Sequence, residues 1–236
     1  MADTFRKLLH YLRLVPRRRW LDILILFIGV LAPLFLFGEL AEEVLEKEPF
    51  AIDRPILLFM QQHATPLLDR AMVFISEVGS IRVLGPCALL LAVYFIIRQH
   101  WARLVYWVLA FGGAILLNMG AKQLFSRTRP DLWISIAPET SYSFPSGHSM
   151  QSMAFITALV ILAWHRPALR PWSVAGALFV VLVGLSRVYL GVHFPTDVLA
   201  GWTAALAWCT GLAFVLRRRL KVERKLGKAA KAGGPR

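Results

Sequence analysis

Six long stretches without Asp, Glu, Lys or Arg constrain the fold of this chain more than any other feature. They cover residues 23–38, 83–97, 104–121, 149–164, 171–186 and 198–216. A helix that crosses a bilayer needs about 20 mostly apolar residues, within a range of roughly 17–25. Most of the stretches reach that length once their flanking turns are included. The sequence therefore predicts an all-α, polytopic membrane protein with six transmembrane helices.

A soluble helical protein is the main alternative, and composition argues against it. The 236 residues are 57% hydrophobic and 17% charged, whereas a soluble domain carries about 25% charged residues. Six such stretches cannot all be hidden in the core of one small domain. A cleaved signal peptide is a second alternative, because a basic segment precedes the first stretch. No convincing small-residue cleavage site follows it, so we expect an uncleaved first span.

The distribution of basic residues predicts the orientation. If the N-terminus is cytoplasmic, 19 of the 27 Lys and Arg residues fall on the cytoplasmic side, as the positive-inside rule requires. We expect a basic cytoplasmic N-terminus at residues 1–20, a six-span membrane domain at 21–216 and a basic, disordered cytoplasmic tail at 217–236. The net charge of +13 is then explained by contact with anionic lipid headgroups, and a nucleic-acid partner is not expected.

Residues 41–82 form the longest connection on the predicted outer face. They begin with acidic side chains and continue with segments that have mixed polar and apolar faces. This pattern predicts an interfacial helical segment of one or two amphipathic helices on the outer face. Such a segment could cover an outer-facing site, although simple packing against the spans is the favoured explanation.

Polar clusters stand at the ends of the last four predicted spans, and the C-terminal one contains a histidine–carboxylate pair. His193 precedes Asp197 by four residues, and Pro195 lies between them. Because proline favours the first turn of a helix, we expect the sixth span to begin beside Pro195, with Asp197 in its first turn. A carboxylate held against one imidazole nitrogen leaves the other nitrogen free as a nucleophile. A histidine beside a capping aspartate, without chemistry, is the alternative.

The other clusters provide a helix N-terminus and cations. Ser146, Gly147 and His148 follow Pro145 and open the fourth span, where free backbone N–H groups can bind phosphate oxygens. Lys122 and Arg187 end the third and fifth spans, and Arg129 lies in the loop between spans three and four. Any one of these cations could simply extend its charge to the membrane surface. Arg127 is a further outer cation, to which the sequence assigns no role.

The clusters together resemble the signature of the type-2 phosphatidic acid phosphatase superfamily. The signature consists of Lys122 and, after six intervening residues, Arg129-Pro130, then Pro145-Ser146-Gly147-His148, and finally Ser186-Arg187 with His193 and Asp197. Each element matches without departure and in the same order. The superfamily includes membrane lipid phosphatases and soluble vanadium haloperoxidases, and the apolar spans favour the membrane branch.

The resemblance implies a role for each residue of the signature. His193 would attack phosphorus and form a phosphohistidine, and Asp197 would orient His193 and stabilise its positive charge. His148 would protonate the leaving group and then activate water. Lys122, Arg129 and Arg187 would bind the phosphoryl oxygens, with assistance from Ser146 and Gly147. These roles agree with general chemistry, since phosphoryl transfer depends chiefly on positioning and charge stabilisation.

No metal site and no cofactor are expected. The sequence contains no cluster of carboxylates, histidines or cysteines with metal-ligand spacing, and Cys87 and Cys209 are interpreted as packing residues within spans. We therefore predict a metal-independent lipid phosphatase of the inner membrane, with its active site on the outer face. Its oligomeric state is left open.

The predicted partners are membrane lipids and a lipid phosphate substrate. Undecaprenyl pyrophosphate is the first choice, and phosphatidylglycerophosphate, phosphatidate and the lipid A phosphates are alternatives. A transporter or flippase is a different class of function, but transporters usually carry ionisable residues near the bilayer midplane. An inactive scaffold is opposed by the complete set of signature residues.

Overall fold

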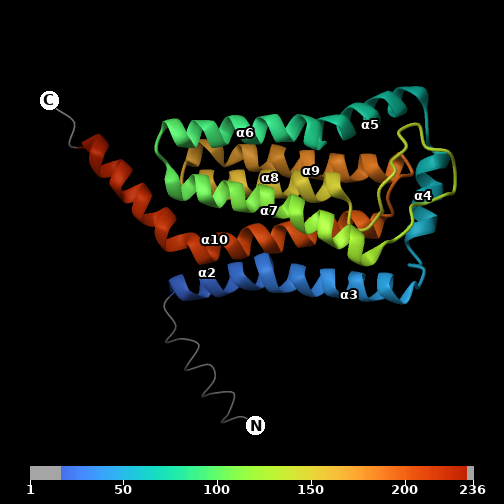
Figure 1. Cartoon of the computed structure of the whole chain (residues 1–236), viewed down its shortest axis with the longest axis horizontal. Helices are drawn as coiled ribbons and strands as arrows, with labels where there is room; N and C mark the ends of the chain where they lie inside the picture. Colours follow the sequence, from blue (N-terminus) through green and yellow to red (C-terminus); the bar gives the residue numbers. More distant parts are fainter. Residues whose placement is uncertain (1–16, 233–236) are drawn as a thin grey trace, which may run out of the picture.

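The computed structural model describes residues 17–232, with side chains described for residues 20–223, and all regular structure within them is helical (Figure 1). The α-helices are α2 (Arg17–Leu26), α3 (Ala32–Glu46), α4 (Asp53–Gln62), α5 (Pro66–Val78), α6 (Ile81–Ile97), α7 (Trp101–Phe125), α8 (Gly147–Ala163), α9 (Pro171–Tyr189) and α10 (Pro195–Ala232). A π-helical turn, η1 (Phe27–Leu31), joins α2 to α3, and a 3₁₀ turn, η2 (Pro167–Leu169), precedes α9.

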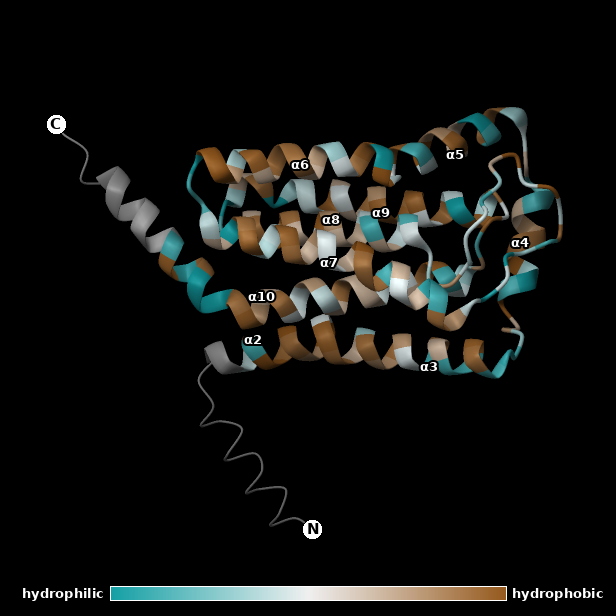
Figure 2. Cartoon of the chain, viewed as in Figure 1, coloured by the Kyte–Doolittle hydropathy of each residue, from teal (hydrophilic) through white to brown (hydrophobic). Residues whose placement is uncertain are grey.

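The prediction of six membrane spans is confirmed in the described part of the chain. Five helical stretches are long and apolar enough to cross a membrane: Trp20–Glu46, Pro66–Ile97, Trp101–Phe125, Pro167–Tyr189 and Pro195–Glu223. The sixth, α8, is a shorter apolar helix of 17 residues. Figure 2 shows hydrophobic residues along the lengths of these helices and hydrophilic residues mainly near their ends.

Two further helices, α4 and α5, account for most of the predicted interfacial segment at 41–82. Helix α4 lies across one end of the bundle, while α5 extends obliquely towards α6 and forms one apolar stretch with it (Figure 1). Thr65 begins α5 as its N-cap, since its side chain accepts a hydrogen bond from the Leu68 N–H at 3.3 Å. Helices α4 and α5 both contact α9, so the segment covers the end of the bundle at which α10 begins.

Small residues allow the central helices to pack closely. Ala110 and Ala114 of α7, Ala154 of α8 and Ala205 of α10 are fully buried in one core cluster. Gly201 of α10 lies directly against α8, because a Cβ atom there would come within 2.7 Å of the Ser146 carbonyl oxygen. This close approach places the second turn of α10 against the N-terminal turn of α8.

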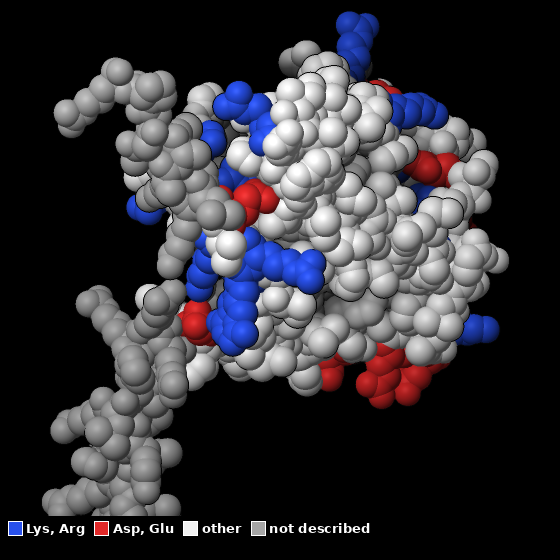
Figure 3. Space-filling model, turned by 60° about the vertical axis from the view of Figure 1, so that its left-hand side comes forward, with Lys and Arg blue, Asp and Glu red and all other residues white. Residues whose placement is uncertain are grey.

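The C-terminal segment differs from its prediction. Disorder was expected from residue 217, but α10 continues as a helix to Ala232, because Arg, Lys, Leu and Ala are good helix formers that extend a helix already begun. Residues 233–236 and 1–16 lie outside the described residues. Helix α2 begins and α10 ends at the end of the bundle away from α4 (Figure 1), and basic side chains are visible near that end in Figure 3.

Candidate active site

Four helix ends bring the predicted site residues together beside α4. Lys122 lies in the last turn of α7, His148 in the first turn of α8, Arg187 in the last turn of α9 and Asp197 in the first turn of α10. His193 lies in the short connection from α9 to α10, and Arg129 lies in the loop between α7 and α8. The sequence separates these residues by up to 75 positions, and the helix bundle returns them all to one end.

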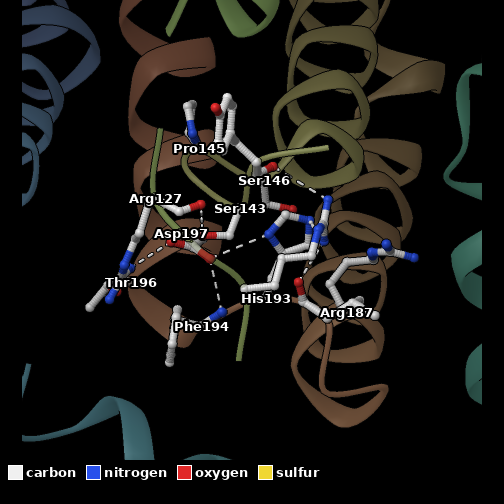
Figure 4. Close-up of polar contacts among 12 residues, drawn as sticks. Arg127, Ser143, Pro145, Ser146, Arg187, His193, Phe194, Thr196 and Asp197 are labelled. Atoms are coloured by element: carbon white, nitrogen blue, oxygen red, sulfur yellow. Dashed lines mark hydrogen bonds and ion pairs between the residues drawn. The ribbon is translucent and has the colours of Figure 1, made fainter. Parts of the chain in front are cut away.

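His193 and Asp197 form the buried centre of this site (Figure 4). The His193 Nδ1 atom lies 3.3 Å from Asp197 Oδ2, and both side chains are almost completely buried. The same Oδ2 atom accepts a hydrogen bond from the Phe194 N–H at 2.9 Å. Since Phe194 directly precedes helix α10, this bond fixes the carboxylate relative to the connection that carries His193.

The surroundings of His193 favour a neutral imidazole. Burial is the main cause that holds the pKa of His193 well below its usual value, and the positive charges of Arg129, Arg187 and Lys122 add to it. In the tautomer with the proton on Nδ1, the ring donates to Asp197 and its Nε2 lone pair faces Arg129 Nη1 at 3.2 Å. A neutral ring with Nε2 unprotonated is the form that can act as a nucleophile.

Arg129 joins the α7–α8 loop to His193. Its Nη1 donates to the Val192 carbonyl oxygen at 2.6 Å, and its Nε donates to the Ser141 carbonyl oxygen at 2.6 Å. Lys122 Nζ donates to the Ser141 hydroxyl at 2.8 Å. Lys122 and Arg129, two of the three predicted cations, therefore both contact Ser141, and Arg129 lies on the Nε2 side of the His193 imidazole.

The turn at Ser146 and Gly147 is held by neighbouring helices. The Ser146 N–H donates to the Asp197 carbonyl oxygen at 3.0 Å, and Asn118 of α7 donates to the Pro145 carbonyl oxygen at 3.0 Å. Ser146 occupies the N-cap position of α8 without a capping bond from its side chain, and its hydroxyl instead accepts from Ser149. The first N–H groups of α8 therefore keep their capacity to bind an anion.

Arg187 is the third predicted cation, and its guanidinium is already engaged. The side chain is buried, its Nη1 donates to Ser76 at 2.5 Å, and its Nη2 donates to Glu139 at 2.6 Å. Its Nε atom is buried without a partner among the described residues. His148 is half-buried nearby, where the charges of Arg187 and Glu139 act on its ring.

Sequence reasoning missed several polar residues of the site. Arg127 bonds to Asp197 at 2.6 Å and to Asp53 of α4 at 2.8 Å, and Glu139 bonds to Arg187. Thr196 donates to Asp53 from both its backbone N–H and its hydroxyl. The only signal in the sequence was the position of Arg127 two residues before Arg129, and nothing in the sequence linked either residue to Asp53.

An open groove of about 820 Å³ lies beside Lys122, between the C-terminal part of α7 and loop residues 140–142. Its lining residues are Met119, Gly120, Lys122, Gln123, Thr140, Ser141 and Tyr142. The lining combines polar groups beside the cations with apolar surface further along α7. The described residues contain no group of three or more His, Cys, Asp or Glu side chains placed to hold a metal ion, and the metal-independent mechanism stays a prediction.

Comparison with known proteins gives the family of this site. The sequence profile of the PAP2 superfamily matches residues 101–221, the region from α7 into α10 that carries every signature residue. The chain belongs to the PAP2 superfamily. The predicted membership is confirmed by this match, and the prediction of a phosphatase is confirmed by the match together with the phosphatase relatives described next.

PAP2 relatives extend the similarity beyond that region. Phosphatidylglycerophosphatase B of Bacillus subtilis is 38% identical over 163 residues, which cover 66% of this chain and 77% of that protein. Undecaprenyl-diphosphatase of Sulfolobus acidocaldarius is 36% identical over 141 residues, covering 57% and 64%. The crystal structure of a transmembrane PAP2-type phosphatidylglycerolphosphate phosphatase from Bacillus subtilis matches with a TM-score of 0.66 and 32% identity, covering 79% of this chain and 94% of that one.

Proposed function

We propose that this chain is an integral membrane lipid phosphatase that removes a terminal phosphate through a phosphohistidine intermediate. The observation that carries the proposal is the environment of His193, whose Nδ1 is held by Asp197 and whose Nε2 faces a group of cations. That arrangement presents a nucleophile to an anion and stabilises the charge that develops during transfer.

The proposed reaction has two steps. In the first, His193 Nε2 forms a bond to phosphorus while the bond to the leaving oxygen breaks, and His148 gives its proton to that oxygen. In the second, water attacks phosphorus, gives its proton to His148, and the N–P bond breaks to release phosphate. Lys122, Arg129 and Arg187, together with Ser146 and the Gly147 amide, hold the phosphoryl oxygens in both steps.

The proposed substrate is a lipid monophosphate or diphosphate. Undecaprenyl pyrophosphate is the first candidate, and phosphatidylglycerophosphate, phosphatidate and lipid A phosphates are the others, because the two sequence relatives are named for substrates of the first two kinds. The test is phosphate release by the purified protein from a panel of these lipids, with and without EDTA. Release from none of them would overturn the proposal, and release that EDTA abolishes and Mg²⁺ restores on a soluble ester would overturn the metal-independent mechanism.

The groove beside Lys122 supports a lipid substrate and gives a first prediction. Gly120 lines the groove, and a Cβ atom there would meet no other atom within 4 Å. Gly120→Leu should therefore fold normally but fill the groove, and we expect KM for a long-chain lipid phosphate to rise about tenfold. Hydrolysis of a small soluble phosphate ester should be nearly unchanged, which the same enzyme preparation can show.

Gly112 provides the matched control for this variant. It lies two turns earlier in α7, has equally open space, and does not line the groove. Gly112→Leu should leave KM for both substrates near the wild-type value. An equal rise of KM in both variants would show that the groove does not receive the lipid.

The proton donor gives a second prediction. If His148 protonates the leaving oxygen, His148→Ala should slow hydrolysis of an alkyl phosphate by about 10²–10⁴-fold. It should slow hydrolysis of an aryl phosphate much less, because a weakly basic leaving group needs little protonation. Steady-state rates on the two soluble esters test this, and equal losses on both would assign His148 a different role.

Orientation gives a third prediction. We propose an inner-membrane protein with both termini cytoplasmic and the active site on the outer face, supported by the bias of basic residues towards one side. In a Cys87→Ser background, a cysteine at exposed Asp131 should react with an impermeant thiol reagent on intact cells. A cysteine at Val222 should react only after the cells are opened, and the reverse pattern would place the active site in the cytoplasm.

A further inference from the structure

Arg127 connects two buried carboxylates that belong to different parts of the fold. Its Nη1 donates to Asp197 Oδ1 at 2.6 Å, and its Nη2 donates to Asp53 Oδ2 at 2.8 Å. Asp53 and Asp197 are 3% and 0% exposed. The guanidinium therefore links the first turn of α4 to the first turn of α10, and each nitrogen serves a different carboxylate.

The position of Arg127 is fixed from several other directions. Its guanidinium carbon lies 4.1 Å from the centre of the Phe194 ring and 5.2 Å from the centre of the Phe50 ring. Its Nη1 also donates to the Thr196 hydroxyl at 2.8 Å. A planar cation held between rings and bonded on its edges has little freedom to turn.

The two oxygens of Asp197 have separate functions in this arrangement. Oδ2 faces His193 Nδ1 and the Phe194 N–H, while Oδ1 is bonded to Arg127. Arg127 itself makes no bond to His193 or to the cations Lys122, Arg129 and Arg187. The charges that act most on the pKa of His193 are those of Arg129, Arg187, Lys122 and His148, so the shared carboxylate is the direct connection from Arg127 to the imidazole.

We propose that Arg127 is a positioning residue for the phosphatase reaction. It holds Asp197 in the orientation that His193 needs, and its positive charge weakens the attraction of the Asp197 carboxylate for a protonated His193 ring. The inference rests on the proposed function. Asp53 helps to hold Arg127 in this position, because its carboxylate accepts hydrogen bonds from Arg127 and, at 3.1 Å, from the Thr196 backbone N–H.

The charges around His193 decide the sign of the expected effects. The groups that face it are Asp197 on α10, Arg187 on α9, Lys122 on α7, His148 on α8, and Arg129 and Glu139 on the α7–α8 loop. Asp197 is the anion closest to Nδ1. Removing the cation from its other oxygen strengthens its attraction for an imidazolium, so the pKa of His193 should rise.

The test compares pH profiles of kcat/KM for a soluble phosphate ester. Arg127→Met should lower kcat about 10–100-fold, as loss of a residue that orients a reactive group commonly does, and should move the acid limb up by about one pH unit. KM should stay within about threefold, because Arg127 does not touch the phosphate-binding cations. A purely structural defect would instead lower the rate equally at every pH.

Two further variants keep the test decisive if Arg127→Met fails to fold. Arg127→Lys keeps the charge but cannot reach both carboxylates, so kcat should fall while the acid limb stays near its wild-type position. Asp53→Asn removes a negative charge, so its acid limb should move down rather than up. An acid limb of Asp53→Asn that moves up or does not move, or an Arg127→Lys variant that keeps wild-type kcat, would overturn the inference. An inactive wild-type protein would instead refute the proposed function.

Glu139 carries a second, independent inference. Its carboxylate bonds to Arg187 Nη2 at 2.6 Å and lies 3.8 Å from Arg129 Nη2. Burial works to raise its pKa, but Arg187, followed by His148 and Arg129, outweighs burial and lowers the pKa below its usual value. Glu139 is therefore an anion at neutral pH, in contact with two of the cations assigned to the substrate phosphate.

We infer that Glu139 competes with phosphate for Arg187 and Arg129 and thereby limits product inhibition. The same N–H of Arg187 cannot donate fully to the carboxylate and to a phosphate oxygen, so the Glu139 carboxylate must leave before phosphate binds completely. The apparent affinity for phosphate is then reduced by the fraction of molecules in which Glu139 occupies the cations.

The experiment measures binding of vanadate and inorganic phosphate to purified protein by calorimetry, without turnover. Glu139→Gln should bind both about tenfold more tightly than wild type, and inorganic phosphate should become a stronger competitive inhibitor. Glu139→Asp, whose shorter side chain reaches Arg187 poorly, should change in the same direction by less. Asp131→Asn makes the same charge change at an exposed position of the loop and should bind both anions as wild type does.

Weaker or unchanged binding in both Glu139 variants would overturn this inference. Tighter binding in Asp131→Asn of equal size would also overturn it, since the cause would then be the net charge of the loop. Failure of the wild-type protein to bind either anion would refute the proposed phosphate site itself.

Discussion

Replacing His193 by alanine should reduce phosphate release to the background rate while the protein still inserts and folds. The side chain is buried, and its Nε2 is the nitrogen that faces the cations, so the remaining groups would bind phosphate without a nucleophile. The measurement is release of phosphate from a soluble ester and from a lipid phosphate, with the melting transition of the purified protein as the check on folding.

The proposed phosphohistidine intermediate allows a second, direct measurement on the same variant. Wild-type enzyme that is mixed with labelled substrate and stopped in alkaline detergent should carry a labelled phosphoryl group, and His193→Ala should carry none. His63, an exposed histidine at the end of α4, provides the control, because His63→Ala should retain both turnover and label. Substantial turnover by folded His193→Ala would remove His193 from the role of nucleophile.

Asp197→Asn should lower turnover by about 10⁴-fold, the loss found when the aspartate of a serine-protease triad is changed in the same way. The carboxylate now accepts from Arg127 on one oxygen and faces His193 Nδ1 with the other. An amide has only one oxygen, so its NH₂ group must face one of these two donors. If it faces His193, the imidazole is driven to the wrong tautomer.

Asp69 offers a matched control for that variant. Its carboxylate accepts a hydrogen bond from the Tyr189 hydroxyl at 2.7 Å, and asparagine can keep this bond through its oxygen. Asp69→Asn should therefore keep turnover within a few-fold of wild type. If Asp197→Asn behaved in the same way, the pairing of Asp197 with His193 would be structural rather than catalytic.

Much of the fold could be predicted because membrane insertion acts on local sequence. Each span is visible as an uncharged stretch, and α7, α8 and α9 begin and end within four residues of theirs, whereas α3 and α10 continue beyond theirs to Glu46 and Ala232. Proline at 195 and serine at 146 correctly predicted where α10 and α8 begin. The tail was misjudged because composition alone does not show that a preceding helix can be extended.

The site was predictable only where its residues form a spaced pattern. His193, Asp197, His148 and the three cations follow such spacing, and the structure brings them to one end of the bundle. Arg127 and Glu139 could not be assigned in the same way, because their roles depend on contacts with residues 74 and 48 positions away. Those contacts exist only after the α7–α8 loop has folded over the helix ends.

Helix α10 is longer than the hydrocarbon core of a bilayer is thick. From Asp197 to Ala232 the helix runs for roughly 53 Å at 1.5 Å per residue, whereas the hydrocarbon core of a bilayer is about 30 Å thick. With Asp197 near one surface, the opposite end of α10 therefore extends well clear of the lipid tails. Energy transfer from a fluorophore attached at that end to a lipid-bound acceptor would measure how far the end lies beyond the nearer membrane surface.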